Sequence, residues 1–219
     1  MPISAVIFDF NGTLFWDTHL HRQAWDIYLN IHGIRLSDQD RQKIFHGKSN
    51  QDIYTALYKH KARSGDVESL ITEKEGIYQK LCLQSKLDLA PGAASLLDFL
   101  NLKQIPFCIA SSSGLENIEF YMKYLDLGRW FDLSRIVYND GTLQGKPAPD
   151  VFLKAFGLLN AQPQDVLIFE DSISGLIAAK KARSGKVIIV NSHGLKYSWF
   201  NYPRITHFDQ VDRGMFFPT

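Results

Sequence analysis

Side chains able to carry phosphoryl chemistry follow short apolar segments or precede a helix start. Phosphoryl transfer needs an oxyanion nucleophile, a divalent cation, a positive charge for the phosphate oxygens and a hydrogen-bond donor. Each group also has a plainer role, because carboxylates and serines at strand ends commonly cap the next helix and loop lysines are commonly solvated. Their order and matching location favour one shared site. The residues are Asp9, Ser111, Lys146 and the pair Glu170-Asp171.

The apolar segments before these residues have the length of buried strands. Runs of four or five apolar residues without alternation are typical of parallel strands that helices cover on both faces. In such sheets, ligands bind beyond the carboxyl ends of the strands. The residues named above should therefore converge on one edge of a sheet. We expect strands at residues 5–8, 106–110, 166–169 and 187–190.

Helical periodicity separates most of these strands, which predicts a doubly wound parallel α/β sheet. The expected helices cover residues 93–102, 115–125 and 150–159. The segment 17–87 breaks this alternation, since it shows helical periodicity and no convincing strand. We therefore predict an α/β core domain from residues 1–15 and 89–219, with an inserted all-helical cap, or lid, at 16–88. The segment from Ser192 onward is aromatic-rich and irregular, and the sequence gives it no function.

Composition and charge favour a small-molecule enzyme. Of 219 residues, 24 are basic and 23 acidic, which leaves a net charge of +1 and gives no sign of a nucleic-acid partner. No segment approaches the roughly 18 apolar residues of a membrane span, and the start does not read as a signal peptide, so we expect a cytoplasmic location. The two cysteines, Cys82 and Cys108, form no metal or disulfide pattern, and Cys108 should be buried and inert.

Four motifs carry a family resemblance. Asp9-Phe10-Asn11-Gly12-Thr13 resembles the first motif of the haloacid dehalogenase superfamily, Asp-x-Asp-Gly-Thr/Val. Residues 110–113, 145–150 and 169–175 resemble the second, third and fourth motifs, in the same order. The resemblance spans residues 3 to about 190, and it is nearest to the β-phosphoglucomutase-like and phosphatase branch, which carries a helical cap at this point.

The resemblance implies a role for each matching position. Asp9 would attack phosphorus to form an aspartyl phosphate, while Ser111 and Lys146 would hold phosphate oxygens. Asp9, Asp171 and the backbone carbonyl of Asn11 would ligate Mg²⁺, with Glu170 nearby or bonded through water. This is the oxygen ligand set that Mg²⁺ prefers. The backbone N–H groups of Gly12 and Thr13 would approach the phosphate, and Ser112 would contact the substrate.

The cap should supply further substrate contacts. His21 falls where the mutase-like branch often has histidine, and Lys74 shares a helix face with Tyr78, a pairing that recurs in the branch. Residues 46–52 resemble the substrate loop of the branch, which adds Gly47 and Lys48 to the candidates. The mutases have an arginine where Asn50 stands, and this difference argues against a mutase.

One position departs from the first motif. Where phosphatases and mutases have a second aspartate that transfers protons, this chain has Asn11. A carboxamide hydrogen-bonds but does not exchange a proton near neutral pH, and general acid–base help is worth about 10²–10⁴ in rate. Three explanations stay open: an engineered Asp-to-Asn substitution, a different proton donor such as His19 or His21, or a degenerate member with a binding role.

Taken together, these residues predict a Mg²⁺-dependent phosphatase acting on a small phosphorylated metabolite such as a sugar phosphate. The alternatives are a β-phosphoglucomutase-like hexose-phosphate mutase and a catalytically weakened phosphometabolite-binding protein. The acidic pair Glu170-Asp171 argues against a metal-free dehalogenase, and a phosphonate hydrolase would need a Schiff-base lysine in the lid. We expect no nucleic-acid or membrane partner. The sequence does not determine the oligomeric state, and we favour a monomer.

Overall fold

The computed structural model describes residues 3–45, 50–59 and 67–217. The chain divides into two compact units, residues 1–16 with 88–219 and residues 17–87. Each unit is described by itself. That the second unit is a cap domain with bounds 16–88 stays a prediction.

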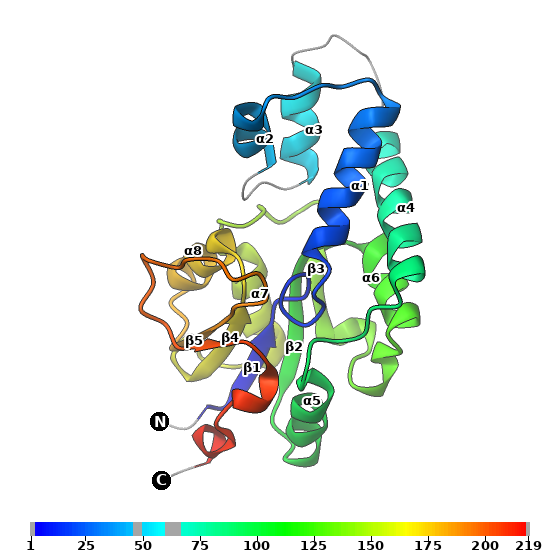
Figure 1. Cartoon of the computed structure of the whole chain (residues 1–219). Coiled ribbons are helices and arrows are strands. Elements are labelled where there is room, and N and C mark those ends of the chain that lie inside the picture. Colours follow the sequence, from blue (N-terminus) through cyan, green and yellow to red (C-terminus); the bar gives the residue numbers. More distant parts are fainter. Residues whose placement is uncertain (1–2, 46–49, 60–66, 218–219) are drawn as a thin grey trace. The chain divides into compact units, whose positions relative to one another are not determined.

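The first unit is built on a six-stranded parallel sheet in the order β3-β2-β1-β4-β5-β6 (Figure 1). The first strand of the chain therefore lies in the middle, between β2 and β4, and strands are added outward on both sides. This confirms the predicted doubly wound α/β class. The strands are β1 (Ala5–Phe8), β2 (Phe107–Gly114), β3 (Ile136–Asn139), β4 (Val166–Glu170), β5 (Lys186–Val190) and β6 (Arg204–Ile205).

Two of these strands, β3 and β6, are absent from the sequence prediction. Both lie at the edges of the sheet. Only half of β3 is buried, and β6 has only two residues. Neither offers the continuous apolar run that identifies a central strand. Edge strands can be short and partly polar because one side of each faces no partner strand.

The helices described in this unit are α5 (Ala93–Leu102), α6 (Leu115–Tyr124), α7 (Asp150–Leu159) and α8 (Ile173–Lys181). Three of them, α5 to α7, follow the expected positions closely, and the fourth, α8, is absent from the sequence prediction. The described part of this unit also contains five short 3₁₀ helices: η1 (Leu127–Arg129), η2 (Leu133–Arg135), η3 (Pro163–Asp165), η4 (Phe208–Gln210) and η5 (Arg213–Phe216).

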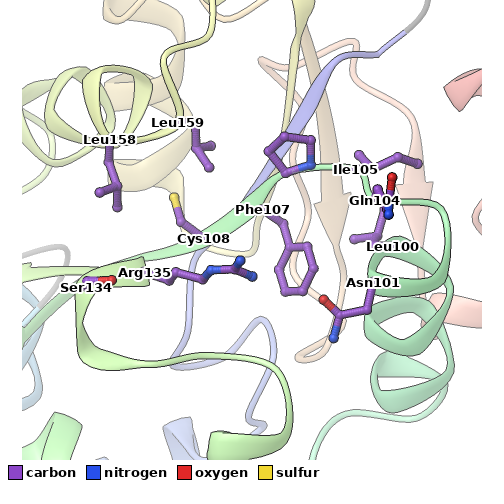
Figure 2. Close-up of a pocket in the computed structure, with 11 residues that line it drawn as sticks. Leu100, Asn101, Gln104, Ile105, Phe107, Cys108, Ser134, Arg135, Leu158 and Leu159 are labelled. Atoms are coloured by element: carbon purple, nitrogen blue, oxygen red, sulfur yellow. The ribbon is translucent and has the colours of Figure 1, made fainter.

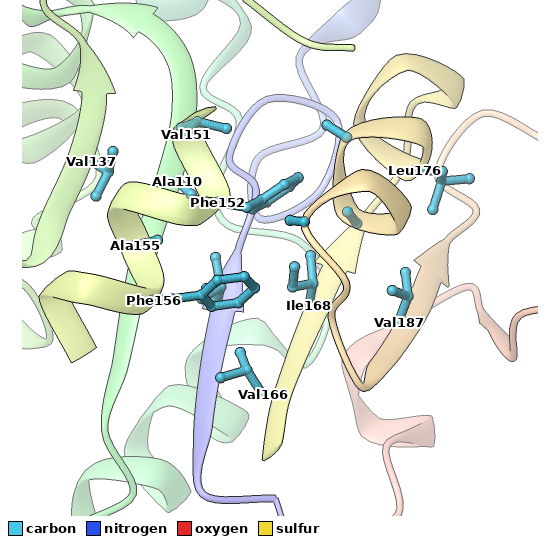
Figure 3. Packing of buried hydrophobic residues seen from close by; sticks show 14 of the residues in the cluster. Ala110, Val137, Val151, Phe152, Ala155, Phe156, Val166, Ile168, Leu176 and Val187 are labelled. Carbon is cyan, nitrogen blue, oxygen red and sulfur yellow. The ribbon is translucent and has the colours of Figure 1, made fainter. Parts of the chain in front are cut away.

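Apolar side chains cover both faces of the sheet, which explains why its central strands carry no alternation. On one face, α7 and α8 pack Phe152, Phe156 and Leu176 against the strands (Figure 3). On the other face, Phe8 stacks on Phe169 with ring centroids 5.1 Å apart. Burial on both faces holds the strand ends rigidly, so the residues that follow them are fixed in place.

Across its described residues, 17–45, 50–59 and 67–87, the second unit is built of helices, as predicted for this segment. Its helices are α1 (Thr18–Ile31), α2 (Asp38–Phe45), α3 (Asn50–Lys59) and α4 (Val67–Ser85). Trp25, Tyr28 and Tyr54 form the centre of its apolar core. Gly33 follows α1 with a φ of +61°, a left-handed conformation that suits glycine. None of the helices that the structure describes has both the length and the apolar character needed to span a lipid bilayer.

Candidate active site

Three carboxylates gather at the carboxyl ends of β1 and β4. Residues Phe8 and Phe169 are paired in the parallel register of these two strands, so Asp9 and Glu170 leave the sheet side by side. One oxygen from each of Asp9, Glu170 and Asp171 lies within 4.8 Å of the other two, and all three residues are buried. We call these three residues the acidic cluster.

Lys146 reaches the acidic cluster from the loop before α7. Its Nζ lies 2.5 Å from Asp9 Oδ1 and 2.7 Å from Glu170 Oε2, and 4.9 Å from the centre of the Phe152 ring. Burial alone would lower the pKa of Lys146, but Asp9 and Glu170 outweigh it and raise that pKa above its ordinary value. With a side chain only 6% exposed, Lys146 is not a solvated loop lysine.

The electrostatics of the cluster suit a bound cation. Burial raises the pKa of Asp9 well above its usual range, the Glu170 carboxylate raises it further, and Lys146 opposes the shift. Burial likewise raises the pKa of Asp171. Three buried carboxylates face one ammonium group, so their ionised forms are under-compensated. A divalent cation with oxygen ligands would offset this charge, and these side chains fit Mg²⁺.

Glu170 is fixed by its own backbone neighbourhood. Its Oε1 accepts hydrogen bonds from the Ser172 N–H at 2.9 Å and the Ser172 hydroxyl at 2.8 Å. Ser172 is itself the N-cap of α8, because its hydroxyl accepts from the Gly175 N–H. The N-cap role is therefore filled by Ser172 rather than by the acidic pair. A Cβ on Gly175 would lie 2.0 Å from the Glu170 carboxyl, so only glycine permits this approach.

The loop after Asp9 forms a tight turn. The N–H groups of Gly12 and Thr13 donate to the carbonyls of Phe15 and Phe10. The phosphate contacts that the family resemblance implies for Gly12 and Thr13 stay a prediction. The tight turn uses these donors internally. Gly12 has a φ of +84°, and a Cβ there would lie 2.2 Å from Asp171 Oδ2. The buried Thr13 hydroxyl donates to Asp171 Oδ1 at 2.9 Å, which ties the loop to the acidic cluster.

Asn11 is held by two side chains that the sequence did not identify. Its Nδ2 donates to the Tyr121 hydroxyl at 2.9 Å, and its Oδ1 accepts from the Ser113 hydroxyl at 2.8 Å. Tyr121 is buried on α6, where the sequence pattern identified only a core helix. No local signal marks this contact, because it joins residues 110 positions apart. The predicted role of the Asn11 backbone carbonyl as a metal ligand stays a prediction.

The serines near the carboxyl end of β2 differ in exposure. Ser111 is 1% exposed, and its hydroxyl accepts from the Ser113 N–H at 3.1 Å. Ser112 is exposed. The first of the three serines is thus positioned at the carboxyl edge of the sheet, in the strand next to β1. Phosphate contacts by Ser111 and Ser112 remain predictions.

The second unit contains a buried polar network around His21 and Lys74. Lys74 Nζ lies 2.9 Å from His21 Nδ1 and 2.8 Å from Glu75 Oε1. An ammonium only donates, so His21 Nδ1 accepts and Nε2 carries the proton toward Asp17 Oδ2, 3.3 Å away. The Tyr78 ring stacks on the His21 ring at 3.8 Å, and its hydroxyl donates to Asp17.

This network gives Lys74 and His21 defined partners within their own unit, and Lys74 is fully buried. That they contact substrate stays a prediction. Gly47 and Lys48 lie outside the described residues, and so does the side chain of Asn50. Trp25 packs in the core of the unit, as expected, with Lys74 Nζ 5.4 Å from its ring centre.

A cavity of about 510 Å³ lies at the opposite, amino-terminal edge of the sheet (Figure 2). It is lined by Phe107 and Cys108 at the start of β2, Arg135 before β3, and the C-terminal residues of α5 and α7. None of the predicted site residues lines it. Since the acidic cluster lies at the carboxyl edge, this cavity is not part of the candidate active site.

Comparison with known proteins finds relatives that match most of the chain. Residues 3–183 match the haloacid dehalogenase-like hydrolase family. A crystal structure of a family IA, variant 3 HAD hydrolase from Entamoeba histolytica HM-1:IMSS has a TM-score of 0.85 and 32% identity, with 97% of each chain covered. The phosphorylated carbohydrates phosphatase of Thermotoga maritima is 27% identical over 183 residues, covering 82% of each chain.

The bifunctional riboflavin kinase/FMN phosphatase of Arabidopsis thaliana is 31% identical over 190 residues, which are 86% of this chain. The chain spans about half of that relative's length, 48%. The family match covers the whole ordered series of motifs from Asp9 to Asp171. The chain therefore belongs to the haloacid dehalogenase-like hydrolases, in the subfamily IA branch of phosphatases and β-phosphoglucomutase-like proteins, and is a phosphohydrolase enzyme.

Proposed function

We propose that the protein is a Mg²⁺-dependent phosphatase of a small phosphorylated metabolite such as a sugar phosphate, with Asp9 as its nucleophile. The observation that carries this proposal is the acidic cluster bridged by Lys146 at the carboxyl edge of the sheet. The similarity to the Thermotoga phosphatase, whose name specifies phosphorylated carbohydrates, favours a sugar phosphate as the substrate class.

Asp9 and Asp171, with the backbone carbonyl of Asn11, would hold Mg²⁺, and Glu170 would lie beside it. When bound, the cation supplies positive charge for the phosphate oxygens and compensates the buried carboxylates. Its positive charge would offset the burial and the neighbouring Glu170 charge that raise the pKa of Asp9, and would favour the ionised, nucleophilic form of this side chain.

Hydrolysis would proceed in two transfers at phosphorus. A carboxylate oxygen of Asp9 forms a bond to phosphorus while the bond to the leaving oxygen breaks, and that oxygen takes a proton from solvent. Water then attacks the aspartyl phosphate, loses a proton to solvent, and releases inorganic phosphate and the free carboxylate. Lys146 would turn from Asp9 toward the phosphate oxygens and balance the charge that builds on them.

Asn11 favours a second candidate, a catalytically weakened phosphometabolite-binding member. Its carboxamide is engaged by Tyr121 and Ser113 and transfers no proton, so leaving groups of high pKa should depart slowly. A mutase is less favoured, because Asn50 stands where the mutases have an arginine. Tight phosphate-ester binding without turnover would identify the binding member.

The test is a hydrolysis screen with Mg²⁺ across sugar phosphates, glycerol phosphate and an aryl phosphate. We expect Mg²⁺-dependent phosphate release that EDTA abolishes. Asp9→Asn should remove both turnover and labelling by beryllofluoride, a mimic of the aspartyl phosphate. Asp98→Asn is a matched control, since Asp98 is exposed and accepts a hydrogen bond from Trp130 in the same unit. Normal turnover in Asp9→Asn would overturn the proposal.

A further inference from the structure

The segment after β5, to which the sequence assigned no function, contacts both parts of the chain that carry the proposed metal ligands: the loop after β1 and the residue after β4. The Ser192 hydroxyl donates to the Gly12 carbonyl at 2.6 Å, and the Tyr197 hydroxyl donates to the Asp171 carbonyl at 2.6 Å. Between them, the buried Nε2 of His193 lies 3.5 Å from Asp171 Oδ2 and makes no hydrogen bond within the described residues. We call Ser192, His193 and Tyr197 the Asp171 clamp.

The clamp is itself held firmly by the core. Tyr197 is 1% exposed and belongs to the apolar cluster under α7 and α8. Arg204 of β6 donates to the Tyr197 carbonyl at 3.0 Å, and its guanidinium lies 5.8 Å from the centre of the Tyr197 ring. Because β6 pairs with β5, the segment between them is anchored at both ends. The short strand β6 therefore helps to hold the Asp171 clamp in place.

The clamp joins two chain segments that are far apart in sequence. Gly12 belongs to the loop that follows Asp9, and Asp171 follows β4. The two residues lie so close together that a Cβ on Gly12 would be 2.2 Å from Asp171 Oδ2. Thr13 orients Asp171 Oδ1 from the loop side. The clamp holds the opposite side through the Asp171 carbonyl, with His193 Nε2 3.5 Å from Oδ2, and it holds the loop through the Gly12 carbonyl.

We propose that Ser192, His193 and Tyr197 are positioning residues that set the divalent-cation affinity of the site by fixing the Asp171 carboxylate relative to the Asp9 loop. This inference rests on the proposed metal-dependent function. Ligands that are held before the cation arrives lose little freedom on binding it, and loss of such outer contacts typically costs about 10–100-fold in metal affinity. The clamp touches no reacting atom, so its loss should act through the cation.

The experiment measures cation binding directly on the full chain, with Mn²⁺ as the probe. Electron paramagnetic resonance of free Mn²⁺ gives its dissociation constant, and competition gives that of Mg²⁺. Tyr197→Phe and Ser192→Ala should each weaken Mn²⁺ and Mg²⁺ binding, by about 10–100-fold for Tyr197→Phe. The Mg²⁺ concentration needed for half-maximal turnover should rise equally, while turnover at saturating Mg²⁺ stays near that of the parent protein.

Matched controls are Tyr202→Phe and Ser198→Ala, which make the same chemical changes in the same segment. Tyr202 stacks on Phe200 instead of contacting Asp171, and Ser198 is exposed. Both controls should bind Mn²⁺ as the parent does. Thermal unfolding in EDTA reports the fold of every variant, and Ser192→Ala carries the test if Tyr197→Phe does not fold.

The outcomes separate this inference from the proposed function. Parental Mn²⁺ affinity in the clamp variants, with only a lower unfolding temperature, would show that the segment is merely structural and would overturn the inference. Failure of the parent protein to bind Mn²⁺ or Mg²⁺ would overturn the metal-dependent function, and the clamp with it. Weaker binding in the clamp variants but not in the controls supports both.

Discussion

Replacing Asn11 with aspartate tests whether the missing proton carrier limits this enzyme. The change is isosteric, and the surroundings accept it. The Ser113 hydroxyl already donates to Asn11 Oδ1 at 2.8 Å, and the Tyr121 hydroxyl, 2.9 Å from Nδ2, can rotate to donate to a carboxylate oxygen instead. The Asn11→Asp variant should therefore fold as the parent does, with both hydroxyls satisfied.

The size of the expected gain follows from the proton chemistry. General acid–base catalysis contributes about 10²–10⁴ in rate, or about 3–5 kcal/mol of barrier. Two donated hydrogen bonds favour the ionised form of the introduced carboxyl and lower its pKa, so less of it is protonated at neutral pH. We therefore expect sugar-phosphate turnover to rise by about 10², at the lower end of this range.

Rapid-quench kinetics on two substrates provide the assay. The aryloxide group of an aryl phosphate leaves without protonation. Transfer of the phosphoryl group to Asp9 should therefore be nearly as fast in the parent as in Asn11→Asp. Breakdown of the aspartyl phosphate should lag in the parent, because the attacking water has no base, and a burst of aryl alcohol should precede steady turnover. The burst should fade in Asn11→Asp. Equal gains on both substrates, or none on either, would refute the reasoning and indicate another proton carrier, such as His21.

Three further predictions concern the acidic cluster. Lys146→Ala leaves buried carboxylates uncompensated, so the metal-free variant should lose about 3–5 kcal/mol of unfolding free energy. It should also bind beryllofluoride more weakly. An unchanged unfolding free energy and an unchanged beryllofluoride affinity would contradict this prediction. The raised pKa values of Asp9 and Asp171 mean that the metal-free folded state binds more protons than the unfolded one, so its stability should fall as pH rises through these values. Mg²⁺ binds the ionised carboxylates of Asp9 and Asp171. The unfolding temperature in Mg²⁺ should therefore exceed that in EDTA by more at pH 8 than at about pH 5. The opposite trend would exclude these two residues as ligands. Gly175→Ala forces a Cβ to 2.0 Å from the cluster and should cost about 1–3 kcal/mol in denaturant unfolding, whereas Gly157→Ala, with open space around it, should not.

The sequence by itself determined where the chemistry-bearing residues lie. Strands apolar on both faces identify a parallel sheet, and in such a sheet the residues that follow the strands share one edge. This geometry predicts the convergence of Asp9, Ser111 and the acidic pair, and the order of the four motifs predicts the family. Three of the four helices described in the core, α5 to α7, were predictable because each buries a periodic apolar face against the sheet.

The tertiary structure alone decided what those residues touch. The turn after Asp9 uses the N–H groups of Gly12 and Thr13 internally, and the Thr13 hydroxyl binds Asp171. Tyr121 reaches Asn11, and Tyr197 reaches Asp171, across long separations in sequence. A pattern of residue types indicates which face of an element is buried, but a hydrogen bond between distant side chains depends on how helices and loops pack over the sheet. That packing is a property of the folded chain as a whole, and no local sequence signal specifies it.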